Sequence, residues 1–324
     1  MLTIKEYNAL FTQHLEQRIT PKDPSGLYAP IHYILTLKAK RLRPVLTLMT
    51  ADVFGAPVTR ALNAALAVEL FHNFTLIHDD IMDRALLRRG QPTVHEKWDL
   101  NTGILSGDVM LVMAMQCLEH YPPDTFAALS GLFHKTAVKV CEGQQYDMDF
   151  EIRQRVTIPE YLEMISCKTA VLVAAAMKMG AITAFAPQDQ AEAIYRFGLN
   201  LGIAFQLKDD YLDTFGNAGT FGKRIGGDIT ANKKTFLYVK ALETLDEKDA
   251  EQLQWLYSEP AKSEAQKIDD VKNLFLKSGA DVQTLAEIER YTDHAFAFLE
   301  QLTVDAAAKT ALRDFAADLM NRIF

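Results

Sequence analysis

The sequence has few cysteines, and their arrangement excludes two common kinds of stabilising site. Among 324 residues there are three, Cys117, Cys141 and Cys167, an odd number with no C-x-x-C spacing. Disulfide frameworks of secreted proteins need paired cysteines, and structural zinc sites need closely spaced ones. We therefore expect three reduced core thiols that bind no metal, as is typical of a cytoplasmic protein.

An excess of basic residues is also missing. Lysine and arginine together number 34 against 42 aspartates and glutamates, which gives a net charge of -8. A nucleic-acid-binding surface is normally basic, so we expect no nucleic-acid partner. Any cations that bind an anionic ligand must then be gathered locally.

Long hydrophobic runs and flexible linkers are absent as well. The first residues, Met1–Glu6, lack the basic and apolar regions of a signal peptide. The most apolar stretch, residues 170–186, contains Lys178 and Gly180 and falls short of the roughly 18 apolar residues that a membrane-spanning helix needs. We expect a buried core helix there, no transmembrane segment, and a single domain over residues 1–324, since no Pro/Gly/Ser-rich segment divides the chain.

Apolar residues recur at three- and four-residue spacing almost throughout, which predicts an all-α protein. Helices are expected at residues 61–77, 106–120, 125–150, 158–185, 188–214 and 235–245. No run of alternating apolar and polar residues predicts a strand. Breaks are expected at residues 55–57, 122–123 and 187 and in the loop 216–232, where proline and glycine accumulate.

Two aspartate clusters of identical spacing are the most informative feature of the sequence. They are Asp79-Asp80-Ile81-Met82-Asp83 and Asp209-Asp210-Tyr211-Leu212-Asp213. Residues four apart lie above one another on a helix, so each cluster directs its carboxylates along one face. Partly buried carboxylates are costly unless a partner neutralises them. Mg²⁺ takes one or two carboxylates and leaves its other positions for water and phosphate oxygens. We therefore predict a phosphorylated ligand carried by Mg²⁺.

Basic residues near the clusters are candidates to bind that ligand. Arg88-Arg89-Gly90 follows the first cluster, and its guanidinium groups would hold phosphates bidentately or form salt bridges with the aspartates. Lys40-Arg41-Leu42-Arg43-Pro44 is a second basic group, which alone would equally be a solvated helix start. The glycine-rich loop 216–232 favours a lid with Lys223, Arg224 and Lys233 as its cations, or else a plain surface connection.

Seven motifs occur in a characteristic order. They are Lys40-x-x-Arg43-Pro44, Glu69-Leu70-Phe71-His72 leading into His78–Asp83, Arg88-Arg89-Gly90, Gly143-Gln144-x-x-Asp147, Lys168-Thr169-Ala170, Phe205-Gln206 leading into Asp209–Asp213, and the segment from Gly222 to Thr235. Together they resemble the trans-isoprenyl diphosphate synthase (polyprenyl synthetase) family over nearly the whole chain. The resemblance implies an all-α, isoprenoid synthase-type helical bundle around a deep central cavity, assembled as a homodimer. It also implies a prenyltransferase that condenses isopentenyl diphosphate with an allylic diphosphate, head to tail.

The resemblance further implies a role for each motif residue. Asp79, Asp83 and Asp209 would be direct ligands of three Mg²⁺ ions that bind with the substrate diphosphate, with Asp80, Asp210 and Asp213 as supporting members. Arg88, Lys168, Lys223 and Lys233 would hold the allylic diphosphate, supported by Asp147 and Gln206. Lys40, Arg43, His72 and Arg89 would hold isopentenyl diphosphate. Thr169 and Gln206 would stabilise the carbocation through their oxygen dipoles, or would simply be polar packing residues.

Product length depends on the helix before the first cluster. Phe74 lies five residues before Asp79, about 7 Å deeper along a helix. It is either the floor of the cavity or an ordinary core phenylalanine. With the small Thr75 beside it, the pattern resembles enzymes that make twenty-carbon geranylgeranyl diphosphate. Farnesyl diphosphate synthesis is the alternative, followed by a longer product or a non-catalytic synthase subunit, and Met110 and Met113 are further candidates for the floor.

Two other enzyme classes share part of this pattern. A metal phosphohydrolase could use His78-Asp79, but it needs further histidine ligands, and the eight histidines do not cluster suitably with the second aspartate group. A terpene cyclase would share the first cluster but commonly lacks a matching second one. Both clusters are intact, which favours the synthase.

Overall fold

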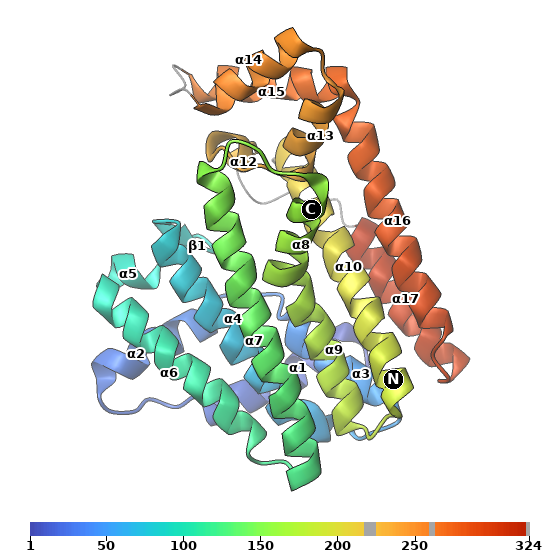
Figure 1. Cartoon of the computed structure of the whole chain (residues 1–324). Helices are drawn as coiled ribbons and strands as arrows, with labels where there is room; N and C mark the ends of the chain where they lie inside the picture. The colour runs from blue at the N-terminus through green and yellow to red at the C-terminus, as the bar shows by residue number, and fades with distance from the viewer. Residues whose placement is uncertain (217–224, 259–262, 322–324) are drawn as a thin grey trace. The chain divides into compact units, whose positions relative to one another are not determined.

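The computed structural model describes residues 1–216, 225–258 and 263–321, and over these residues the chain is almost entirely helical (Figure 1). The all-α prediction is therefore confirmed. The predicted lid cations Lys223 and Arg224 lie outside the described residues.

The helices have the following bounds: α1 Ile4–Arg18, α2 Ser25–Thr36, α3 Leu42–Val53, α4 Leu62–Met82, α5 Val94–Lys97, α6 Leu100–Leu118, α7 Pro123–Ile152, α8 Ile158–Ile165, α9 Val171–Thr183, α10 Gln188–Phe215, α12 Gly227–Thr230, α13 Phe236–Thr244, α14 Glu247–Ser258, α15 Glu264–Ser278, α16 Ala280–Glu300 and α17 Ala306–Asn321. A 3₁₀ turn, η1, covers Val58–Ala61, and a π-helical turn, η2, covers Ser166–Ala170.

Local sequence explains where several helices start. Thr3 accepts a hydrogen bond from the backbone N–H of Glu6, whose carboxylate accepts one from the backbone N–H of Thr3. Thr157 and Glu160 repeat this capping box at α8. Such reciprocal bonds satisfy N–H groups that the first helical turn leaves unpaired. The predicted proline breaks also hold, since α7 begins at Pro123 and α10 directly after Pro187.

One short hairpin departs from the sequence-based expectation. Strand β1, Leu87–Arg88, pairs antiparallel with β2, Gln91–Pro92. Arg89 and Gly90 form the turn, with φ of 55° and 75°, and a tight two-residue hairpin turn needs positive φ at both positions. Helix α4 ends at Met82, so the paired arginines lie on a hairpin and not on a continuing helix. Two-residue strands are too short to give a periodic signal.

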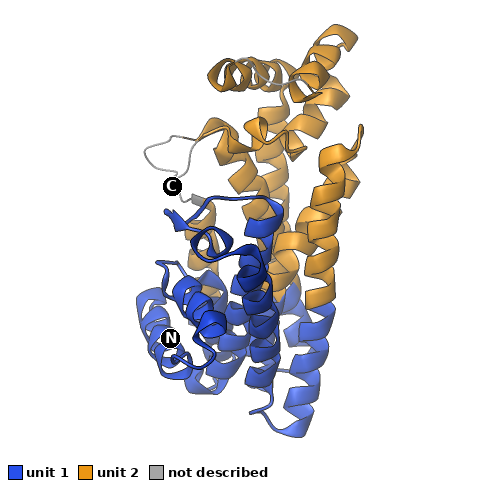
Figure 2. Cartoon of the chain, turned by 90° about the vertical axis from the view of Figure 1, so that its left-hand side faces the viewer, with its two compact units in different colours: residues 1–136, 175–195, 303–308 blue, residues 137–174, 196–302, 309–324 orange. Residues whose placement is uncertain are grey.

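The chain divides into two compact units, coloured separately in Figure 2. Unit 1 comprises residues 1–136, 175–195 and 303–308, and unit 2 comprises residues 137–174, 196–302 and 309–324. The boundary falls inside α7, α9, α10 and α17. The single domain over residues 1–324 stays a prediction.

In unit 1, α4 packs against α3 and α6. The contact with α6 is close because α6 has glycines where the helices meet. A Cβ atom on Gly107 would lie 2.3 Å from Nε2 of His78, and one on Gly103 would lie 2.9 Å from Cδ1 of Ile81. Helix α4, which carries the first aspartate cluster, is thereby fixed against α6.

In unit 2, the core gathers side chains from α8, α10, α13 and α15. Tyr161, Leu207, Leu237 and Phe275 are almost inaccessible to solvent there. Helix α13 packs on α15 and α16, and α14 packs on α15. The second aspartate cluster therefore lies on a helix whose apolar side is part of this core.

The cysteine prediction is partly wrong. All three thiols are free, and Cys167 is buried as expected, but Cys117 is only half-buried and Cys141 is exposed. An odd count leaves at least one cysteine unpaired, but it does not predict which side of a helix each residue occupies.

The most apolar region is longer than the sequence suggested. Helix α8, η2 and α9 together give a helical run, Ile158–Thr183, that is long and apolar enough to cross a membrane by length and composition alone. About two thirds of its most apolar window (67%) is buried within the protein. Burial of this kind is expected of the core helix that the sequence predicted.

Candidate active site

The first aspartate cluster lies at the end of α4 in unit 1. Asp80 is buried, and its carboxylate accepts hydrogen bonds from Nη2 of Arg88 at 2.5 Å and from Nε at 3.0 and 3.3 Å. Asp79 is half-buried, whereas Asp83 follows the last residue of α4 and is exposed. The expectation of six partly buried carboxylates is therefore wrong at Asp83, because the helix ends one residue earlier.

Arg88 reaches Asp80 because the hairpin carries β1 back toward α4. Burial raises the pKa of Asp80 above its usual value, although the Arg88 guanidinium acts in the opposite direction. Of the two interpretations that the sequence left open for Arg88, the salt bridge is the one present in this structure. The predicted role of Arg88 in binding diphosphate is not tested by this pairing.

A basic group lies on α3 and α4 of unit 1. Nη1 of Arg43 lies 3.1 Å from Nε2 of His72, and Nε of Arg43 is buried without a hydrogen-bond partner among the described residues. Burial and the positive charges of Arg43, Arg89 and Arg88 hold the pKa of His72 far below its usual value. His72 is therefore neutral and accepts from Arg43, in surroundings that favour an anion.

A salt bridge beside this group was missed by the sequence analysis. Arg41 has a left-handed backbone, with φ of 50°, and its Nη1 lies 3.1 Å from Oε1 of the buried Glu69. Asn73 also donates to Glu69 at 3.1 Å. Since Arg41 binds Glu69, it orients the start of α3 next to Arg43. Lys40, predicted to bind the same ligand as Arg43, is exposed.

The predicted chain-length residues lie about one turn before the first cluster on α4. Phe74 is buried, with its ring edge-on to His78 at 4.8 Å between centroids and tilted against Phe71 at 5.6 Å. Thr75 is half-buried and donates to the carbonyl of His72 at 2.8 Å. Phe74 therefore has the surroundings of a core residue, and its role as a cavity floor stays a prediction.

The second aspartate cluster lies entirely within α10 in unit 2. Asp210 is buried, and its two oxygens have separate donors: the Tyr161 hydroxyl at 2.6 Å and the Gln206 amide at 2.8 Å. The pKa of Asp210 is raised to about 7, mainly by burial and in part by the nearby charges of Asp209 and Asp147, while its two hydrogen bonds act in the opposite direction. Both donors are neutral, so neither compensates the charge of this carboxylate as Arg88 does in the first cluster.

Asp213 is tied to the segment that follows the glycine-rich loop. Its carboxylate accepts from the backbone N–H of Asp228 at 2.9 Å, and its carbonyl accepts from that of Gly226 at 2.7 Å. Burial, together with the charges of Asp210 and Asp213, raises the pKa of Asp228 well above its usual value. The sequence analysis gave Asp228 no role, although it directly follows the paired glycines of the last motif.

Three lysines of unit 2 line a cavity that Asp210 also lines. Nζ of Lys168 lies 2.5 Å and Nζ of Lys233 lies 3.3 Å from one oxygen of Asp147. Burial would raise the pKa of Asp147, but the two ammonium groups lower it below its usual value. Lys234 donates instead to the carbonyls of Phe150 at 2.6 Å and Glu151 at 3.2 Å, at the end of α7. Lys223, which was also predicted to hold the allylic diphosphate, lies outside the described residues.

The π-helical turn η2 sets the positions of Lys168 and Thr169. Two glycines allow neighbouring helices to approach its backbone: a Cβ atom on Gly143 of α7 would lie 2.2 Å from the backbone N of Lys168, and one on Gly202 of α10 would lie 2.7 Å from Cα of Ala170. Such single π turns occur frequently at functional sites. The Gly143 motif thus has a steric reason in this structure.

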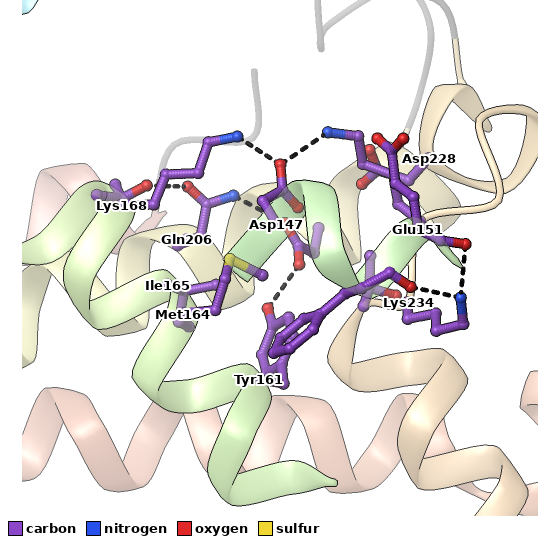
Figure 3. Close-up of a pocket in the computed structure, with 14 residues that line it drawn as sticks. Asp147, Glu151, Tyr161, Met164, Ile165, Lys168, Gln206, Asp228 and Lys234 are labelled. Atoms are coloured by element: carbon purple, nitrogen blue, oxygen red, sulfur yellow. Dashed lines mark hydrogen bonds and ion pairs between the residues drawn. The ribbon is translucent and has the colours of Figure 1, made fainter. Parts of the chain in front are cut away.

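These groups line a small cavity in unit 2, drawn in Figure 3. It has a volume of about 100 Å³, which is room for roughly three water molecules. Lys168 and Gln206 lie on one side of Asp147, while Tyr161 lies on another. The lining residues are Asp147, Phe150, Glu151, Tyr161, Met164, Ile165, Lys168, Thr169, Gln206, Asp210, Asp228, Lys233, Lys234 and Thr235. Because two lysines are held on Asp147, an arriving anion would compete with that carboxylate for them.

The donor side chains that the structure describes do not form a complete metal site. Within the described part of the chain, no group of three or more His, Cys, Asp or Glu side chains is arranged to hold a metal ion. The carboxylates of Asp210, Asp213 and Asp228 are nevertheless crowded, as their effect on the pKa of Asp228 shows. Crowded carboxylates without a complete ligand set fit Mg²⁺, which needs few protein ligands when phosphate oxygens supply the rest.

Comparison with known proteins agrees with this chemistry. The model of the polyprenyl synthetase family matches residues 24–275. A geranylgeranyl diphosphate synthase from Methanosarcina mazei is 40% identical over 242 residues, 74% of this chain and 75% of that protein. A geranylfarnesyl diphosphate synthase from Natronomonas pharaonis is 38% identical over 261 residues, with 74% of this chain and 75% of that protein covered.

Solved structures extend the similarity to the whole fold. A crystal structure of a geranylgeranyl pyrophosphate synthase is 50% identical, has a TM-score of 0.96, and covers 99% of each chain. A polyprenyl synthase from Caulobacter crescentus, complexed with calcium and isoprenyl diphosphate, is 30% identical with a TM-score of 0.85, covering 98% of this chain and 95% of that one.

The all-α fold and the paired aspartate clusters define an enzyme class, the trans-prenyltransferases that elongate prenyl chains. Within that class the match over residues 24–275 and the identities of 40% and 50% are decisive. The chain belongs to the polyprenyl synthetase family.

Proposed function

We propose that this enzyme condenses isopentenyl diphosphate with an allylic diphosphate, head to tail, and that its main product is geranylgeranyl diphosphate. The observation that carries the proposal is the cavity of unit 2, where Lys168 and Lys233 share Asp147 beside the second aspartate cluster. Cations next to crowded carboxylates suit a diphosphate that binds together with Mg²⁺. Neither group alone would suit such a ligand.

In unit 2, we assign Lys168 and Lys233 to the allylic diphosphate. Both ammonium groups are held on Asp147, so they are close enough to bind one anion together. Lys223 is proposed as a third cation on the sequence motif alone. Asp209 is the proposed Mg²⁺ ligand of this cluster, and Asp210 and Asp213, which are bound to protein donors, are proposed to support it.

In unit 1, we assign the basic group of Arg43 and His72 to isopentenyl diphosphate. Arg43 has a buried Nε without a partner, and its nearest bonded group is the neutral His72. A diphosphate would supply the missing acceptor. Lys40 and Arg89 are exposed and are proposed to complete the site. Asp79 and Asp83 are the proposed Mg²⁺ ligands. Asp80, paired with Arg88, is proposed to support them.

Mg²⁺, when bound, stabilises the charge of the departing diphosphate as a Lewis acid. Lys168 and Lys233 would add two further positive charges to the same leaving group. Thr169 donates to the amide oxygen of Gln206 at 3.0 Å, and the oxygens of both residues are proposed to stabilise the allylic cation as dipoles. No side chain is assigned as the base, and we propose that the departing diphosphate accepts the proton.

The product length is proposed from one residue. Phe74 is buried on α4, before the first cluster, where a bulky side chain would limit growth of the product chain. Farnesyl diphosphate and longer products are the alternatives, because one relative of 38% identity is named for a geranylfarnesyl product.

We further propose a homodimer that works in the cytoplasm. On α6, Ile104, Leu105 and Val112 are exposed by 40%, 57% and 54% and lie at helical spacing. An apolar stripe of this kind is typical of a protein interface, and a two-fold axis would pair it with its own copy. Leu105→Glu should shift the sedimenting species toward the monomer.

The test of the function is incubation with isopentenyl diphosphate, Mg²⁺ and allylic diphosphates of five, ten and fifteen carbons, followed by sizing of the products. We expect elongated prenyl diphosphates that disappear with EDTA and return with Mg²⁺. A cyclic hydrocarbon would indicate a terpene cyclase, and phosphate release without a new carbon bond would indicate a phosphohydrolase. Either result would contradict the proposal.

A further inference from the structure

Tyr161 carries a buried polar group that the proposed reaction does not use. The residue is 1% exposed and lies on α8 within the core of unit 2. Its hydroxyl donates to Oδ2 of Asp210 at 2.6 Å. Figure 3 shows this bond at the cavity wall, with the tyrosine ring extending away from Asp147 into the protein. A short bond to a buried carboxylate is stronger than a bond between neutral groups.

The bond is one end of a hydrogen-bond chain across the cavity wall. Tyr161 binds one oxygen of Asp210, and the Gln206 amide nitrogen binds the other at 2.8 Å. The Gln206 amide oxygen in turn accepts from Thr169 at 3.0 Å. In each of these hydrogen bonds an O–H or N–H group donates and an oxygen accepts. The orientation of the Gln206 amide therefore follows from the orientation of Asp210.

Removal of the Tyr161 hydroxyl would break the first of these hydrogen bonds. One oxygen of Asp210 would lose its donor, and the carboxylate could then rotate away from Gln206. The Gln206 amide would in turn lose its fixed orientation toward Thr169. The affected groups all lie on the wall that also carries Lys168, beside the proposed Mg²⁺ ligand Asp209.

We propose that Tyr161 is a positioning residue for the Mg²⁺–diphosphate site of unit 2. Its hydroxyl holds Asp210 in one orientation, and Asp210 in turn holds Gln206 and the wall of the allylic pocket. Partners of this kind, which orient the groups around a metal site, typically affect metal affinity or activity about 10- to 100-fold. The inference rests on the proposed function, because the ligand of this wall is taken to be an allylic diphosphate.

The test compares Tyr161→Phe with Tyr238→Phe. Tyr238 is also a buried tyrosine of the unit 2 core, 3% exposed, and its hydroxyl has no hydrogen-bond partner among the described residues. Each variant removes one oxygen atom. Binding of Mg²⁺ with inorganic diphosphate is measured by calorimetry without turnover, and the Michaelis constants of both substrates are measured separately.

For Tyr161→Phe we expect a roughly tenfold weaker binding of Mg²⁺ with inorganic diphosphate. The Michaelis constant of the allylic substrate should rise, while that of isopentenyl diphosphate should stay within about twofold. Tyr238→Phe should match the wild type in all three. Wild-type binding in Tyr161→Phe, or an equal loss for both substrates, would overturn the inference.

A double variant tests whether Tyr161 acts through Asp210. In an Asp210→Asn background, Tyr161→Phe should add little further loss, because the two changes disrupt one interaction. Losses that simply multiply would overturn the inference. If Tyr161→Phe does not fold, Asp210→Asn alone must weaken Mg²⁺–diphosphate binding, and wild-type binding would again overturn it. If the wild-type enzyme forms no prenyl product but Tyr161→Phe still weakens the binding of Mg²⁺ with inorganic diphosphate, only the proposed function would be rejected.

Discussion

The two aspartate clusters have the same spacing but different partners for their middle carboxylate. In unit 1, Arg88 forms an ion pair with the buried Asp80. In unit 2, the neutral side chains of Tyr161 and Gln206 bind the buried Asp210. Burial raises the pKa of both aspartates, but a cation opposes this only at Asp80. Identical motifs can therefore carry different charge.

The difference follows from what comes after each cluster in the chain. Helix α4 ends at Met82, and the hairpin that follows returns Arg88 to Asp80. Helix α10 continues to Phe215, and its apolar side is part of the core of unit 2. The donors to Asp210 therefore come from helices. The middle carboxylate of the second cluster is bound by neutral donors, and we expect this cluster to depend more strongly on a bound cation.

The largest expected effect is the loss of a proposed Mg²⁺ ligand. Asp209→Ala and Asp79→Ala should each lower turnover by roughly 10³-fold, about 4 kcal/mol, if the departing diphosphate loses its bridging cation. Circular dichroism should show an intact helical fold, because each change removes one of several crowded like charges. Full activity of either variant, or activity insensitive to EDTA, would disprove the role of the clusters.

Gly143→Ala should have the next largest effect. The added methyl group would lie 2.2 Å from the backbone N of Lys168, so η2 must move and Lys168 and Thr169 with it. We expect a loss of about 10²-fold in kcat/KM for the allylic substrate, since small displacements of binding groups are costly. The matched control is Gly131→Ala on the same helix α7, where an added Cβ meets no atom within 4 Å. Equal behaviour of the two variants would contradict the steric argument.

Arg88→Gln should mainly lower stability. The change leaves Asp80 buried without its cation, and we expect a loss of about 2 kcal/mol at pH 7, below the full value for a buried pair because Arg88 is 30% exposed. The pKa of Asp80, already raised, should rise further. A carboxyl with a raised pKa in the folded state destabilises above that pKa and becomes neutral below it. Chemical denaturation should therefore show a smaller loss at pH 4 than at pH 7, and a loss independent of pH would refute this explanation.

The two basic groups should separate the two substrates. Arg43→Gln should raise the Michaelis constant of isopentenyl diphosphate about tenfold, roughly 1.4 kcal/mol, and should leave that of the allylic substrate largely unchanged. Lys168→Gln and Lys233→Gln should show the opposite pattern and also slow ionisation. Steady-state kinetics with each substrate varied in turn would decide, and equal effects on both substrates would show that the roles are assigned wrongly.

The smallest expected free-energy effect is the change in product length. Phe74→Ala should shift the products toward longer chains by a few-fold in ratio, less than about 1 kcal/mol in the partition between release and further elongation. Phe71→Ala, a buried neighbour on the same helix, serves as the control for loss of packing. Chromatography of dephosphorylated products measures the ratio. An unchanged product spectrum would mean that another residue limits the chain.

Most of the helical architecture was predictable from the sequence. Apolar spacing predicted α7 and α10 to within two residues of their ends, because amphipathic periodicity extends over many residues. Helix α4 continues five residues beyond its expected end, and α6 starts six residues before its expected start. The hairpin at Arg88 was not predictable, since two-residue strands give no such signal. The same limitation left the salt bridge of Arg88 as one of two alternatives.

Residues that act through long-range contacts were the ones missed. Tyr161 lies in an ordinary amphipathic helix, and its bond to Asp210 joins positions 49 residues apart. Glu69 was noted only as part of a motif, and its pairing with Arg41 depends on how α3 packs on α4. Asp228 was recognisable only from its place after two glycines.

The sequence by itself determined the helices, the two aspartate clusters and the local groups of cations, because each depends on residues close together in the chain. Only the tertiary structure decided which carboxylate pairs with which donor: Arg88 with Asp80, Tyr161 and Gln206 with Asp210, and two lysines with Asp147. The physical reason is that the charge of a carboxylate depends on its burial and its neighbours, and both arise when distant segments pack together.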